Sequence, residues 1–81
     1  MKNEDIYREK SDFVAIELGA MLRAASRGQV DRCEYVREGA VEFVNAYGRD
    51  SEEPLFFACV TADSLWAIAK DVQRAAEAYL D

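Results

Sequence analysis

The chain has no histidine, one proline and two cysteines, and it contains no long hydrophobic run. Without histidine, Ser–His–Asp triads, histidine metal sites and imidazole pH switches are excluded. No apolar stretch approaches the roughly 18 residues that a membrane-spanning helix needs, so no membrane span is expected. The N-terminus carries acidic residues where a secretory signal would carry basic ones, and we expect no such signal.

The two cysteines, Cys33 and Cys59, are far apart, and each has apolar neighbours. A small secreted scaffold usually carries four or more cysteines. We therefore expect two reduced core thiols in a cytoplasmic protein, with one disulfide or a reactive thiol as the alternatives. Neither the cysteines nor the carboxylates show a metal-binding spacing, and no glycine-rich phosphate loop is present, so no metal or other cofactor is expected.

The size and charge indicate one acidic domain over residues 1–81. Acids outnumber bases 16 to 10, which gives a net charge of −6, and 51% of the residues are apolar. Such a composition is typical of a folded protein and argues against direct binding to the phosphates of nucleic acid, which needs a basic stripe. A domain this small is marginally stable alone, so self-association is also expected.

Apolar periodicity predicts an all-α fold, a small bundle of three to four helices at about residues 4–27, 32–47, 52–60 and 63–80. The first has two neighbouring apolar stripes, and the last, capped by Thr61 or Asp63, has the clearest 3-4 spacing. Gly39 then falls inside a helix, as a tolerated glycine or at a close helix crossing. Residues 55–61 are strand-like in composition, but we favour a helix because we find no second strand for them to pair with in this chain.

The most regular polar feature is a row of carboxylates on the second predicted helix, formed by Asp31, Glu34, Glu38 and Glu42. On a helix this spacing places neighbouring carboxylates about 6 Å apart on one face. The row could meet a basic surface of a partner, imitate nucleic-acid phosphates, or simply be solvated. Tyr35 stands beside it, off the apolar face, and is a candidate interface anchor.

Four further residues are secondary interface candidates. Glu17 falls within the apolar arc of the first helix, where it could mark a seam between two stripes, form a buried ion pair or act as a catalytic acid. No second catalytic group is spaced to work with it, so we expect no enzyme. Trp66 lies at the edge of the last apolar face, and Phe56 and Phe57 precede that helix.

These observations favour a non-catalytic protein–protein interaction module, a small acidic adaptor or inhibitor whose acidic face binds a basic partner. Phage-borne inhibitors of nucleic-acid-handling machinery share this physical type, which extends the hypothesis to an inhibitor of that kind. One alternative is a structural homo-oligomer, such as a homodimer, built on the spare apolar stripe of the first helix. The other is a phosphate-mimicking acidic protein.

Overall fold

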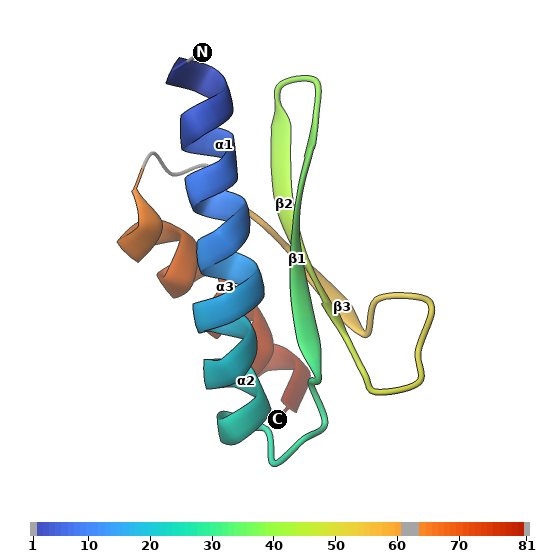
Figure 1. Cartoon of the computed structure of the whole chain (residues 1–81). Coiled ribbons are helices and arrows are strands. Elements are labelled where there is room, and N and C mark those ends of the chain that lie inside the picture. Colours follow the sequence, from blue (N-terminus) through green and yellow to red (C-terminus); the bar gives the residue numbers. More distant parts are fainter. Residues whose placement is uncertain (1, 61–63, 81) are drawn as a thin grey trace.

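The protein combines helices with a sheet, so the all-α prediction is wrong. The computed structural model describes residues 2–60 and 64–80, and its elements follow one another as helix, sheet and helix. The three strands form one antiparallel sheet in the order β1-β2-β3, and the helices gather on one side of it (Figure 1). The elements are α1 (Lys2–Asp12), η1 (Phe13–Leu18), α2 (Gly19–Ala25), β1 (Arg32–Glu38), β2 (Val41–Tyr47), β3 (Phe56–Cys59) and α3 (Leu65–Leu80).

The predicted helix at 32–47 is a β-hairpin. β1 and β2 pair antiparallel from Arg32 opposite Tyr47 to Glu38 opposite Val41, which leaves Gly39 and Ala40 as a two-residue turn. Gly39 has a φ of 62°, and glycine at the first position of such a turn matches the type II′ geometry that suits twisted strands. The glycine interpreted as mid-helix is therefore the turn residue that sets the hairpin register.

The segment predicted as a helix at 52–60 contains strand β3, which pairs antiparallel with β2. Its composition favoured a strand, and only the apparent lack of a partner argued against one. The hairpin supplies that partner, because Ala46 lies opposite Phe56 and Phe43 opposite Cys59. Pairing between chains is thus not needed to form β3.

The helix predicted over 4–27 is confirmed as the continuous α1, η1 and α2, which spans residues 2–25. A π-helical turn at η1 fits an extra residue into the helix and shifts the phase of its side chains. Val14, Leu18 and Leu22 consequently point into the core. In the other predicted stripe, Ile16 faces outward and is 66% exposed. Met21, which the spacing places in the same stripe as Leu18, is 42% exposed.

The predicted C-terminal helix is confirmed as α3, which begins at Leu65 rather than at residue 63. The Oγ of Ser64 accepts a hydrogen bond from the N–H of Ala67 at 3.2 Å, so Ser64 caps the helix. The predicted caps Thr61 and Asp63 lie outside the described residues. Among the helices of the described residues, none has the length and apolar character to cross a membrane.

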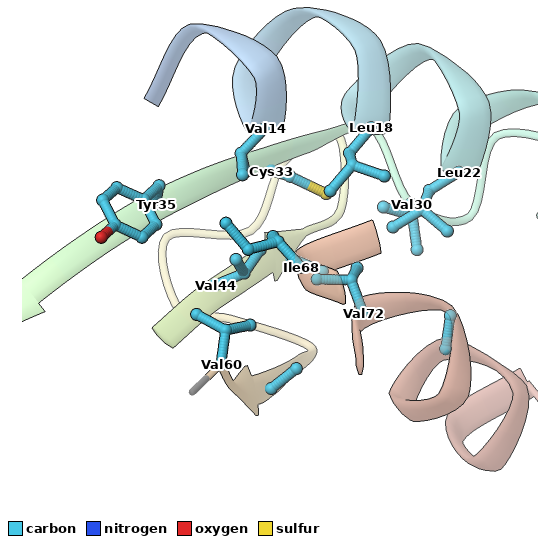
Figure 2. Close-up of a cluster of buried hydrophobic side chains, with 13 residues drawn as sticks. Val14, Leu18, Leu22, Val30, Cys33, Tyr35, Val44, Val60, Ile68 and Val72 are labelled. Carbon is cyan, nitrogen blue, oxygen red and sulfur yellow. The ribbon is translucent and has the colours of Figure 1, made fainter. Parts of the chain in front are cut away.

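The hydrophobic core fills the space between the helices and the inner face of the sheet. Figure 2 shows Val14, Leu18 and Leu22 pointing from the first helix towards the strands, with Ile68 and Val72 entering from α3. This packing covers one face of the sheet, and no helix or strand of the described residues lies over the other face (Figure 1). The fully buried large side chains are Leu18, Ile68, Val14, Val30, Val44 and Val72.

Candidate interaction surface

The sheet has a covered inner face and an open outer face, because side chains alternate along each strand. On the inner face, Cys33, Val44 and Ala58 lie in the core. The outer face carries the alternate residues, and the pairing arranges them in rows across the strands. One row is Val36, Phe43 and Cys59, and the next is Glu34, Asn45 and Phe57.

Apolar side chains cluster on this outer face. We call Val36, Val41, Phe43, Phe57 and Cys59 the open-face patch. Phe57 is 63% and Val41 54% exposed, while Val36 and Phe43 are half-buried. The rings of Phe43 and Phe57 meet edge to face with their centroids 6.4 Å apart. A contiguous exposed apolar surface of this kind is typical of a protein-binding site.

Two carboxylates border the open-face patch on β1. Glu34 and Glu38 lie on either side of Val36, about 13 Å apart along the strand. Within the described part of the chain, the carboxylates that form ion pairs are those of Glu42 and Asp31, so Glu34 and Glu38 form none. We call Glu34 and Glu38 the acidic margin.

Arg32 shares this strand but forms no ion pair with the acidic margin. Its guanidinium stacks 4.5 Å from the ring centroid of Tyr47 and donates to the carbonyl oxygens of Gly48 and Ser51. The hydroxyl of Tyr47 donates to the carboxylate of Glu34 at 3.1 Å. Arg32, Glu34 and Tyr47 also line a concavity with Glu52 of the β2–β3 loop, which adds a further carboxylate at this end.

The predicted carboxylate row does not exist as one face. Glu34 and Glu38 share the open face, but Glu42 lies on the inner side of β2 and Asp31 precedes β1, where it pairs with Arg23 at 3.8 Å. Tyr35 is 3% exposed and belongs to the core, so the prediction of a surface anchor is wrong. The hypothesis of phosphate mimicry depends on carboxylates spaced about 6 Å apart along a helix, and these carboxylates do not lie on a helix.

Glu42 instead belongs to a buried polar cluster with Lys10 and Tyr35. Lys10 is 7% exposed as a residue. Its ammonium lies 3.0 Å from a carboxylate oxygen of Glu42, and the Tyr35 hydroxyl donates to the same oxygen. The hydrogen bond from Tyr35 lowers the pKa of Glu42, and Lys10 adds to this effect. Burial, together with the donated hydrogen bond, raises the pKa of Tyr35. The cluster is mutually satisfied and joins α1 to the sheet.

The two thiols are free and lie on opposite faces of the sheet. Cys33 is buried, as predicted, and burial raises its pKa to about 11. Cys59 is exposed in the open-face patch, so its predicted place in the core is wrong. At neutral pH Cys33 stays protonated and shielded, which makes Cys59 the accessible thiol.

The secondary candidates are scattered. Phe56 points to the inner side, where its ring lies 5.1 Å from that of Tyr79, while its neighbour Phe57 points outward. Glu17 is exposed and lines a groove with Ile16 and Leu65, so it is not a buried carboxylate. Trp66 is 69% exposed, with the ammonium of Lys70 4.6 Å from its ring centroid. Of the four, only Phe57 belongs to the open-face patch.

Comparisons of the chain with protein-family models, with curated proteins and with solved structures gave no match. Within the described residues, no group of three or more cysteines and carboxylates is placed to hold a metal ion. The geometry of the open face is therefore the observation that bears on function.

Proposed function

We propose that this protein is a non-catalytic interaction module, a small adaptor or inhibitor that binds another protein through the open face of its sheet. The observation that carries the proposal is an exposed apolar patch flanked on β1 by two unpaired carboxylates. The chemistry that fits is a partner with an apolar centre and lysine or arginine at its margin. Apolar contacts at the centre would supply affinity, and the charges would supply orientation and association rate.

Two further parts of this proposal have separate support. A cytoplasmic location is supported by two unpaired thiols, since such thiols persist in reducing compartments. Inhibition of nucleic-acid-handling machinery is supported by the net charge of −6, because such machinery presents basic surfaces. The alternative of a homo-oligomer built on the first helix is supported by the exposure of Ile16 and Met21.

Charge reversal tests whether the partner binds the open face or another part of the surface. In co-purification from lysate of the source organism, Glu34→Lys/Glu38→Lys is expected to lose the captured partner, with affinity falling about tenfold or more. The matched control is Glu17→Lys/Glu77→Lys, which changes the net charge equally at exposed helical positions. This control should retain the partner, measured by quantitative mass spectrometry and then by titration with the purified protein.

The opposite pattern would contradict the proposal. If the helical control loses the partner and the open-face variant retains it, the helices form the binding surface. Far-UV circular dichroism and thermal unfolding must first show that both variants fold like the wild type.

A further inference from the structure

Within residues 2–60 and 64–80, no strand pairs with the outer edge of β3, whose main-chain groups are left open there. The N–H of Val60 donates to the carbonyl of Glu42 at 3.0 Å, which fixes the phase of the β2–β3 ladder. Since hydrogen-bonded pairs alternate in an antiparallel ladder, Ala58 faces β2, whereas the N–H and C=O groups of Phe57 and Cys59 face away. Outside that ladder, the described part of the chain gives no backbone hydrogen bond to Phe57 or Cys59.

The opposite edge of the sheet, formed by β1, is in contact with the first helix. The first helix runs beside β1 (Figure 1), and a Cβ built on the buried Gly19 would lie 3.7 Å from the backbone nitrogen of Cys33. The helix therefore shields the β1 edge at this point. The β3 edge is left to pair with an incoming strand.

The four residues of β3 also lack the charged side chains and the proline that commonly prevent pairing between chains. Edge strands are usually protected by charged side chains, proline or a bulge. No charged residue occurs from Pro54 to Val60, and β3 itself is Phe-Phe-Ala-Cys. Phe57 and Cys59 are both exposed on the outer face.

The charge pattern favours a second copy of this chain at this edge. Each copy carries a net charge of −6, so two copies can meet closely only where carboxylates are absent. The β3 edge satisfies this condition, whereas the acidic margin on β1 would bring like charges together. A basic partner, in turn, would gain no charge complement at β3.

We propose that two copies pair antiparallel through β3, about a two-fold axis at Ala58. In this register Phe57 lies opposite Cys59 of the second copy, and the outward main-chain groups of both residues are satisfied. The small side chains of the two Ala58 residues meet in the close, non-hydrogen-bonded position. The two sheets become one, and the two open-face patches become continuous. This inference does not depend on the proposed function.

Proline substitution tests the pairing, with solution mass as the readout. Under reducing conditions the wild type is expected to reach twice its 9.1 kDa mass at high concentration in sedimentation or light scattering. Cys59→Pro removes an outward N–H that β2 does not use, and is expected to be monomeric, while Cys59→Ala stays dimeric. A wild type that is monomeric throughout overturns the proposal.

Further variants separate this interface from the other surfaces. The variant Ile16→Ser on the first helix should stay dimeric. If this variant is monomeric, the interface lies on the outward side of the first helix and the proposal is overturned. Glu34→Lys/Glu38→Lys should also stay dimeric, so loss of the dimer and loss of the partner are distinguishable. If Cys59→Pro fails to fold, hydrogen exchange of the wild-type amides provides the test. The N–H groups of Phe57 and Cys59 should exchange slowly in concentrated wild type and rapidly on dilution. Rapid exchange at all concentrations overturns the proposal.

Discussion

Replacing Glu42 with glutamine is expected to lower the free energy of unfolding by about 2 kcal/mol at neutral pH, measured by urea denaturation. Glu42 is the counter-ion of Lys10, whose side chain is 9% exposed in the ion pair. Removing one partner of a buried pair leaves the other charge uncompensated. The expected loss of unfolding free energy is smaller than for a fully buried ion pair because the Glu42 side chain is 26% exposed.

Two controls make this prediction specific. Glu38→Gln removes a carboxylate on the exposed open face, and its effect should stay within about 0.5 kcal/mol. The pKa of Glu42 is lowered in the folded protein, so its stabilisation is present at neutral pH and is lost as the pH falls through that pKa. The difference between wild type and Glu42→Gln should therefore shrink below about pH 4. Equal effects of Glu42→Gln and Glu38→Gln would contradict the buried cluster.

Leu18→Ala is expected to lower the free energy of unfolding by about 3 kcal/mol, whereas Ile16→Ala should change it by less than about 0.5 kcal/mol. Leu18 is fully buried and Ile16 is 66% exposed, although both are apolar and two residues apart. Truncating Leu18 leaves a cavity in the core, while truncating Ile16 removes side-chain surface that water already contacts.

The comparison tests which side of the first helix faces the core. Both variants are measured by chemical denaturation at a concentration low enough to keep the chain monomeric. A large loss for Ile16→Ala under these conditions would show that the outward stripe is covered within the chain, contrary to the structure.

The helical segments at residues 2–25 and 65–80 could be predicted because their apolar spacing fits a helix and does not fit the alternation of a strand. The hairpin could not be predicted in this way, since Cys33, Val36, Phe43 and Val44 satisfy helical spacing by coincidence. An alternative signal was present: charged and apolar residues alternate over Arg32–Tyr35, and Gly39 occupies a turn position. The wrong prediction for β3 has the same origin. Its composition favours a strand, but with residues 32–47 interpreted as a helix no partner strand is left for it.

The candidate surface was predicted in part. Glu34, Glu38 and Phe57 belong to the open face, although sequence placed Phe57 on a separate segment. Tyr35 and Glu42 were assigned to the same surface because a helix of period 3.6 groups them with Glu34 and Glu38. In a strand of period 2, Tyr35 points away from Glu34, and the cross-strand position of Glu42 brings it to Lys10.

The central claim is that the open face of the sheet binds a partner protein, and site-specific photo-crosslinking from Cys59 tests it most directly. At neutral pH a maleimide–benzophenone should modify Cys59 alone, since Cys33 is buried with a pKa of about 11. The control carries the same label at Ile16→Cys in a Cys59→Ala background, on the exposed side of the helix. We expect a protein other than a second copy of this chain to be crosslinked from position 59 and not from position 16. Crosslinking of such a partner from position 16 alone would contradict binding through the open face.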